Sequence, residues 1–170
     1  LVRSRTFRRR YAPERFSVAG VLQAMNTILH ERQLEEYYCT LCYALFDLKR
    51  RNVVLANSGL PYPVRCTADG CGQIELPGVP LGSFPGVTYD QVTLPLAAGD
   101  FFVFCSDGVF EAFNEQGQEL GAQRLIEIVS AGRSRTARGL VDGIFEEVQA
   151  FRGDAAQNDD MTAVAVKITA

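Results

Sequence analysis

The chain has 170 residues, with 47% apolar and 22% charged side chains and a formal net charge of −3. This composition is that of an ordinary globular domain with enough material for a core, and it excludes a disordered or fibrous chain. The apolar stretches fall well short of the roughly 20 residues that span a membrane, and no leader-like pattern opens the chain. We therefore expect a cytoplasmic protein with no membrane partner.

Basic side chains are concentrated at the start of the chain. Residues 1–15 hold six arginines against one glutamate, whereas the other residues hold 11 basic and 19 acidic side chains. Such arginines could line a patch that binds phosphate or nucleic acid, but no aromatic interleaving or nucleic-acid motif accompanies them. The pattern favours a solvated helical face, and we expect no nucleic-acid partner.

Two helices are predicted before residue 32. Residues 1–11 have the pattern of the end of a helix, and Pro13 interrupts it. A second helix follows Ser17, a typical N-cap residue. His30 lies near its C-terminal end without a partner in view, so we assign it no chemistry. The apolar residues of this helix recur at three- and four-residue intervals and predict one buried stripe: Val18, Val21, Leu22, Met25, Ile28 and Leu29.

From residue 37 the pattern changes to that of strands. "YYCTLCYALFDL" and "NVVLANS", joined through "KRR", predict a hairpin of long strands. "PYPVRC" and "QIEL", separated by "TADGCG", predict a second, shorter hairpin. After a Gly/Pro-rich loop come "YDQVTLPL", the turn "AAGD" and "FFVFCSD". Consecutive strands of this kind indicate antiparallel sheet rather than βαβ units.

The last third of the chain is predicted to form two helices and a strand. The helices lie near residues 121–131 and 134–150, and the second has an apolar face made of Leu140, Val141, Ile144, Phe145 and Val148. The chain closes with "MTAVAVKIT". Its apolar content predicts a strand in the centre of a sheet.

The five cysteines could in principle bind zinc, because Cys39, Cys42, Cys66 and Cys71 would supply four thiolates. The three-residue spacing of Cys39 and Cys42 in a β-rich run, however, directs them to opposite faces. An odd cysteine count without a leader also argues against a disulfide framework. We therefore predict free thiols, with Cys105 as a small core residue, and keep a thiol-zinc module as an alternative.

Three aspartates stand at the edges of apolar strands. Asp107 ends "FFVFCSD", and Asp159 and Asp160 immediately precede the last strand. An unpaired carboxylate beside a buried strand is costly, so a counter-ion is expected. A hard cation such as Mg²⁺ or Mn²⁺ suits oxygen ligands, although Arg or Lys would also serve. On the residues alone, ordinary turn or cap roles for these aspartates stay open.

Four pieces of the chain resemble, in order, the SpoIIE/RsbU branch of the bacterial metal-dependent type 2C protein phosphatases. The family pattern has a strand close to Asn-Ala-Gly-His-Pro, a Pro-Leu-Gly loop, an aromatic-rich strand ending in Thr/Ser-Asp-Gly and followed by Glu-Ala, and a late Asp-Asp-x-Thr. The matching pieces lie within "LANSGLPYPVR", "GVPLGSFPGV", "FFVFCSDGVFEAF" and "QNDDMTAVAVKI". Each piece is weak alone, but four in register over nearly the whole chain are specific.

The resemblance implies an α+β fold, in which two packed antiparallel β-sheets are flanked by α-helices and carry a two-metal centre at one end. Asp107 and Asp159 match metal ligands of the family, and Asp160 is a further candidate ligand. The implied cofactors are two Mg²⁺ or Mn²⁺ ions, which activate a water toward phosphoserine or phosphothreonine. Gly108 would let the backbone turn sharply beside the ligand, and Ser106 would belong to that turn rather than act as a nucleophile.

The chain also departs from the family pattern. An early Gly-Asp strand and an Asp-x-x-Gly-His-Gly segment carry further metal ligands in the family and do not occur here, and Leu60 stands where a histidine is common. We therefore expect residues 1–170 to form a single SpoIIE-type phosphatase domain that lacks its first strands. The sheet edge exposed by their absence would favour strand exchange or a homodimer.

The function implied by the resemblance is that of a metal-dependent serine/threonine protein phosphatase acting on a signalling protein. The implied partners are a phosphorylated STAS-type anti-sigma-factor antagonist and an upstream sensor or response-regulator domain, which would control metal recruitment through the first two helices. The missing early aspartates keep a second function open. It is a degenerate phosphatase fold that acts as a protein-binding signalling adaptor.

Overall fold

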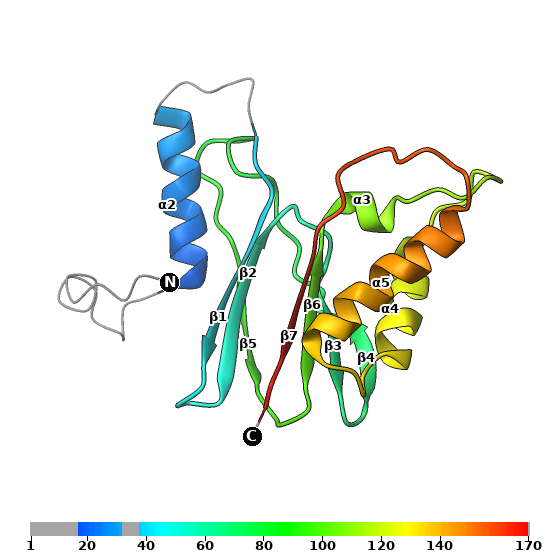
Figure 1. The fold of residues 1–170 in the computed structure, drawn as a ribbon. Coiled ribbons are helices and arrows are strands. Elements are labelled where there is room, and N and C mark those ends of the chain that lie inside the picture. The colour runs from blue at the N-terminus through cyan, green and yellow to red at the C-terminus, as the bar shows by residue number, and fades with distance from the viewer. Residues whose placement is uncertain (1–16, 32–37, 170) are drawn as a thin grey trace. The chain divides into compact units, whose positions relative to one another are not determined.

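The computed structural model describes residues 17–31 and 38–169 (Figure 1). These residues divide into two compact units. The first comprises the described residues up to Asp47 together with Asn52–Gly59 and Leu76–Leu94. The second comprises Leu48–Arg51, Leu60–Glu75 and the described residues from Pro95 onward. The helix predicted for residues 1–11 lies outside the described residues. No helix of the described chain has the length and apolar character that crossing a membrane requires.

The first unit places one helix on a small sheet. Strands β1 (Leu41–Asp47) and β2 (Asn52–Ser58) pair antiparallel, as the sequence predicts, and β5 (Gln91–Pro95) flanks β2. Helix α2 (Val18–Glu31) packs against β1 and β2. The buried core between them consists of apolar side chains from the helix, the sheet and the connecting loops: Val18, Ala19, Leu22, Ala56, Leu81 and Tyr89.

The start of α2 is as predicted, and its buried face is so in part, because Val18 and Leu22 are buried. Ser17 caps the helix, because its Oγ accepts a hydrogen bond from the Gly20 amide at 3.0 Å. Met25 and Ile28, predicted to be buried, are 37% and 49% exposed. Asn26 is buried instead, since its carboxamide donates to the Phe84 carbonyl at 2.9 Å and accepts from the Gly82 amide at 2.8 Å. A polar side chain with both bonds made can occupy a core position.

The second unit contains a four-stranded antiparallel sheet in the order β4-β3-β6-β7. The strands are β3 (Val64–Thr67), β4 (Gly70–Gln73), β6 (Phe101–Cys105) and β7 (Ala163–Lys167). The helices are α3 (Asp107–Phe110), α4 (Gly121–Ala131) and α5 (Ala137–Arg152). Helix α4 packs on β3 and β4, and α5 packs on β7 (Figure 1). The core between helices and sheet includes Val64, Phe101, Val103, Leu125, Val129, Leu140, Ile144 and Val148.

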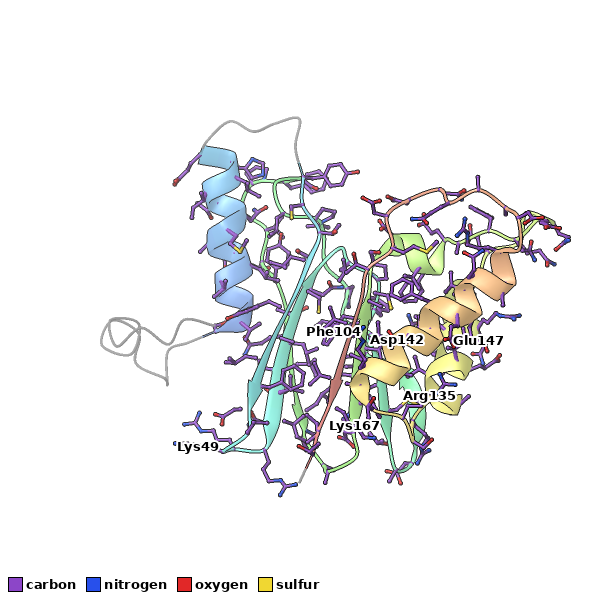
Figure 2. All side chains as sticks on the ribbon, in the orientation of Figure 1. Lys49, Phe104, Arg135, Asp142, Glu147 and Lys167 are labelled. Carbon is purple, nitrogen blue, oxygen red and sulfur yellow. A yellow bond between two sulfur atoms is a disulfide. The ribbon has the colours of Figure 1, made fainter. Side chains whose placement is uncertain are left out.

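Strand β7 lies at the edge of this sheet, so the prediction of a central strand was wrong. Among the described strands it pairs with β6 alone. Ala163 and Ala165 pack against the core, whereas Val164 between them is 51% exposed. The Lys167 side chain donates to the Arg135 carbonyl just before α5, at 2.7 Å (Figure 2). The apolar content of the strand did not predict its edge position, because it carries no information on how many strands pair with β7.

The hairpin of β3 and β4 contains a disulfide between Cys66 and Cys71. The prediction of free thiols is therefore wrong for these two cysteines and correct for Cys39, Cys42 and Cys105. The turn is tighter than "TADGCG" suggested, so that Cys66 and Cys71 are direct cross-strand partners with Cα atoms 4.0 Å apart. Because two of the four proposed thiolates are joined, the thiol-zinc alternative is lost.

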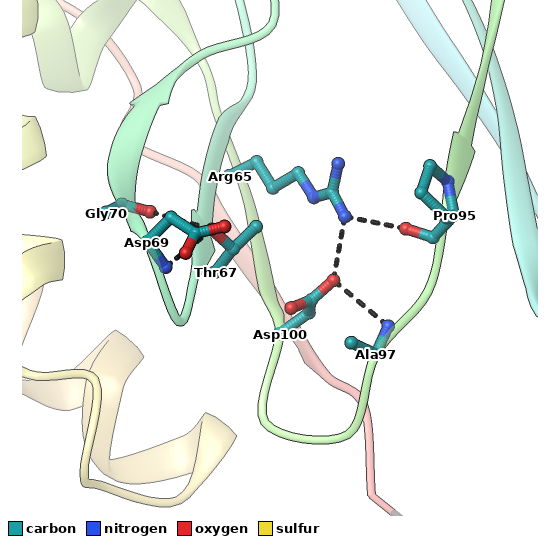
Figure 3. A network of polar contacts seen from close by, with 7 residues as sticks. All are labelled: Arg65, Thr67, Asp69, Gly70, Pro95, Ala97 and Asp100. Atoms are coloured by element: carbon teal, nitrogen blue, oxygen red, sulfur yellow. Dashed lines mark hydrogen bonds and ion pairs between the residues drawn. The ribbon is translucent and has the colours of Figure 1, made fainter.

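An ion pair fastens the turn that leads into β6 (Figure 3). Arg65 Nη2 donates to Asp100 Oδ2 at 2.9 Å and to the Pro95 carbonyl at 2.6 Å. Asp100 Oδ2 also accepts from the Ala97 amide at 3.2 Å. The side chain of Asp100 is only 3% exposed, so its charge is buried with its partner. The network therefore holds the start of β6 in place, and β6 leads directly to the candidate site.

Candidate metal centre

Asp107 stands where the buried strand β6 gives way to α3. Phe101, Phe102, Val103 and Cys105 are buried, whereas Asp107 is exposed. Ser106 precedes the helix in extended conformation (φ −70°, ψ 164°), and Asp107 occupies the first helical turn. One carboxylate oxygen, Oδ1, accepts from the Gly108 amide at 3.0 Å. A rigid strand thus ends in a carboxylate that is presented to solvent.

Ser106 joins this corner to the segment before β7. Its amide donates to the Thr162 carbonyl at 2.9 Å, and its Oγ accepts from the Thr162 amide at 2.9 Å. The same Oγ donates to the Asp160 carbonyl at 3.0 Å. With its hydroxyl committed to two backbone groups, Ser106 belongs to the supporting turn, and nothing in these bonds prepares it as a nucleophile.

Gly108 is required for close approach rather than for a turn. A Cβ at this position would lie 2.5 Å from the Asp160 carbonyl oxygen and 3.3 Å from the Asp159 carbonyl carbon. Gly108 is not among the residues with positive φ, so its backbone conformation does not by itself require glycine. The missing side chain instead lets the two segments touch.

Asp159 and Asp160 lie on the segment that Ser106 and Gly108 contact. Both are exposed. Asp159 Oδ1 accepts from the Asp160 amide at 2.6 Å, and the Gln157 side chain donates to the Asp159 carbonyl at 2.8 Å. The structure therefore brings together the segments that carry all three predicted aspartates. Gln157 had no signal in the sequence, whereas the Thr162 contact coincides with the threonine of the Asp-Asp-x-Thr piece.

The donor chemistry of this corner fits a hard divalent cation. The three side chains offer only carboxylate oxygens, the ligands that Mg²⁺ and Mn²⁺ prefer, and all three are accessible from solvent. Within residues 17–31 and 38–169, no three Asp, Glu, His or Cys side chains converge into a group that could hold a metal ion. The corner therefore supplies suitable donors without a closed set of ligands.

Comparison with known proteins identifies the family. The family model described as "Stage II sporulation protein E (SpoIIE)" matches residues 1–169. The chain belongs to the SpoIIE family. Stage II sporulation protein E of Bacillus subtilis (strain 168) is 26% identical over 148 residues, which are 86% of this chain and 17% of that protein. The chain thus spans less than a fifth of the length of this curated relative.

Solved structures show that the SpoIIE-family chain has the type 2C phosphatase fold. The SiaA-PP2C domain of Pseudomonas aeruginosa superposes with a TM-score of 0.80 at 16% identity, covering 92% of this chain and 63% of that one. The catalytic domain of the serine threonine protein phosphatase PstP, in complex with two manganese ions, has a TM-score of 0.62 at 15% identity and covers 89% and 70%. The expected α+β class, with two antiparallel sheets and flanking helices, is confirmed.

Proposed function

We propose that this SpoIIE-family domain is a catalytically competent, Mg²⁺- or Mn²⁺-dependent phosphatase that hydrolyses phosphoserine or phosphothreonine on a protein. The observation that carries the proposal is the bonding of Ser106 to Thr162 and Asp160, which presents Asp107 and Asp159 on adjoining segments. These are the positions that match metal ligands in the family resemblance. Membership of the SpoIIE family also supports the proposed phosphatase activity.

Each residue of the corner has a distinct role in this proposal. Asp107 and Asp159 would hold the cation, with Asp160 as a third ligand. When bound, the cation supplies charge stabilisation at the phosphoryl group and activates water. Ser106 keeps the Asp160 carbonyl and the Thr162 amide at fixed positions, and Gly108 admits the Asp159–Asp160 backbone. These bonds hold the two segments that carry the carboxylates side by side.

The partners follow from the resemblance and not from any contact in the molecule. The proposed substrate is a phosphorylated STAS-type anti-sigma-factor antagonist, and the proposed regulator is a sensor or response-regulator domain in a longer protein. The single-domain assignment of residues 1–170 and a homodimer stay predictions. The size of the chain on an SDS gel and in solution, compared with that of its natural gene product, would test both.

Hydrolysis of a phosphoserine peptide in the presence of manganese tests the proposal. The exposed carboxylate of Asp107 is replaced in Asp107→Asn, which removes a ligand charge and should lower the rate by about 100-fold or more. The matched control is Asp69→Asn, which alters an exposed aspartate in the β3–β4 turn, at the opposite end of β6 from Asp107. Its rate should be unchanged.

The same assay is run on the longest natural protein that contains the chain. Manganese-dependent turnover that survives Asp107→Asn in both proteins would refute the role of this corner. Absence of turnover in both, with phosphoprotein binding retained, would favour the adaptor function. One observation favours the adaptor function: no closed set of three ligands forms among the described residues.

A further inference from the structure

An open groove lies between α5 and the segment that follows it, inside the second unit. It encloses about 870 Å³, within the range of roughly 300–1,000 Å³ typical of ligand pockets. Its apolar lining comes from Phe145 and Val148 of α5 and from Met161, which directly precedes Thr162. None of these residues has a role in the candidate metal centre.

Polar bonds fix the C-terminal end of α5, where Gln149 and Arg152 line the groove. Arg152, the last residue of α5, is 9% exposed. Its Nη2 donates to the Ala155 carbonyl at 2.7 Å, and its Nη1 donates to the Gln149 side chain at 3.3 Å. The Gln149 amide donates in turn to the Gly153 carbonyl at 3.2 Å. These bonds tie Gly153 and Ala155, which directly follow the helix, to its last turn, so this part of the chain is ordered without a ligand.

The exposed side of the groove is acidic. Asp142 and Glu146 lie one helical turn apart on α5, both exposed, and both line the groove (Asp142 is labelled in Figure 2). Asp142 has an ion pair with Arg138 at 3.5 Å, in which the Arg138 side chain is 88% exposed and therefore weakly held. Arg152 also lines the groove and keeps its positive charge, but it is only 9% exposed and its Nη atoms bond the Ala155 carbonyl and Gln149. A partner with complementary charge would carry a lysine or an arginine.

The groove borders the chain segment that carries Asp159 and Asp160. Gln157 lines the groove and donates to the Asp159 carbonyl at 2.8 Å. Met161 lines it as well and is the neighbour of Asp160 in the chain. A ligand lying in the groove would therefore contact residues next to the Asp159–Asp160 segment. A phosphoprotein substrate is the kind of ligand that could occupy the groove while its phosphorylated residue reaches the candidate metal centre.

We infer that this groove binds a segment of the phosphoprotein substrate in which an apolar residue lies beside a lysine or arginine, close to the phosphorylated residue. The apolar side chain would pack on Phe145 and Met161, and the cation would face Glu146 and Asp142. The inference rests on the proposed phosphatase function and adds a specificity determinant to it. Remote contacts of this kind favour one phosphoprotein over another without touching the reacting phosphate.

Two phosphoserine peptides of equal length test the inference. They differ only beside the phosphoserine, where one carries Leu-Lys-Lys and the other Leu-Glu-Glu, and a second pair carries the same residues on the other side. The ratio of kcat/KM within a pair should favour the lysine peptide by about fivefold or more in at least one pair. In Glu146→Lys, the ratio should fall to about one or invert.

The matched control is Glu147→Lys, which makes the same charge change at the next position of α5, where the side chain is exposed but does not line the groove. This variant should keep the wild-type ratio. An equal ratio in wild type and Glu146→Lys, or an equal loss in both variants, would overturn the inference. Because the ratio compares two substrates of one protein, a partly unfolded variant does not imitate the expected result.

Binding separates failure of the inference from failure of the proposed function. Fluorescence anisotropy of the labelled lysine peptide is measured with wild type, Glu146→Lys and Glu147→Lys, without catalysis. Selective binding that Glu146→Lys weakens by about fivefold, together with no hydrolysis of any peptide, would retain the groove and reject the phosphatase. Hydrolysis without selective binding would retain the phosphatase and reject the groove.

Discussion

Asn26 in the first compact unit and Ser106 in the second both bond to the backbone of a distant loop, but the two side chains have different surroundings. In the first unit Asn26 is 1% exposed and bonds the backbone of Phe84 and Gly82. In the second, Ser106 is partly exposed and bonds Asp160 and Thr162, with exposed carboxylates next to it. The same device stabilises a core in one place and orients charged groups in the other.

Because of this difference, substitutions at the two residues should affect different properties, folding stability at Asn26 and carboxylate placement at Ser106. Bonds made by a fully buried amide cannot be replaced by water, so their loss lowers the free energy of unfolding. Bonds made at an exposed corner can be replaced by water, so their loss is felt mainly as misplacement of the carboxylates. Changes at buried positions should therefore lower the free energy of unfolding more than changes at the exposed corner.

Replacing the buried amide should have the largest effect on folding. Asn26→Ala leaves the Phe84 carbonyl and the Gly82 amide without their side-chain partner and should lower the free energy of unfolding by about 3 kcal/mol. Urea denaturation measures it. The adjacent and 37% exposed Met25 supplies the control, since Met25→Ala should change stability by less than about 0.5 kcal/mol. Equal losses in both variants would show that Asn26 is not a special contact.

Filling the space between the two segments of the corner should be next. Gly108→Ala places a Cβ 2.5 Å from the Asp160 carbonyl oxygen, so the Asp159–Asp160 segment must shift, at a cost of about 2 kcal/mol. Manganese affinity, measured by titration calorimetry, should fall as well. Gly72→Ala is the control because an added Cβ there meets no atom within 4 Å. A fully stable Gly108→Ala protein would contradict the close packing.

Removing the exposed hydroxyl should cost little stability and much activity. Ser106→Ala loses the bonds to the Asp160 carbonyl and the Thr162 amide, which water can partly replace, and should cost about 1 kcal/mol. Manganese-dependent phosphatase activity should fall by about tenfold, since the carboxylates are less well positioned. If Ser106→Ala loses more stability than Asn26→Ala and keeps its activity, the contrast between the two residues is wrong.

The smallest effect concerns the thiols of Cys42, which is half-buried, and Cys105, which is buried. Burial raises the pKa of Cys42 to about 11 and that of Cys105 to about 12, whereas Cys39 is exposed. A raised thiol pKa means that the folded protein binds a proton more tightly than the unfolded chain. The thiols' contribution to the free energy of unfolding is therefore complete below the ordinary pKa of 9.0 and is lost as the pH rises through the pKa of the folded protein. Iodoacetamide at pH 8 should therefore label Cys39 first. Rapid labelling of Cys105 in folded protein would contradict its burial.

Local periodicity predicted most elements with useful accuracy. The predicted helix near residues 121–131 is α4 (Gly121–Ala131), and the strand ending in "FFVFCSD" is β6. The predicted capping by Ser17 is present as well. These features depend on residues within a few positions of one another, where spacing and side-chain type decide which backbone groups need a partner. Asp107 could be singled out for the same reason, because it ends a continuous apolar run.

Local sequence patterns were thus enough to predict the family, the order of elements and the placement of carboxylates at strand ends. Packing was needed to show that Cys66 meets Cys71, that Asn26 is buried, that β7 is an edge strand and that Ser106 bonds Asp160, 54 residues away. Hydrophobic periodicity records which side of an element avoids water. It carries no information on register or on which distant segment covers that side, because those are settled only when the chain packs.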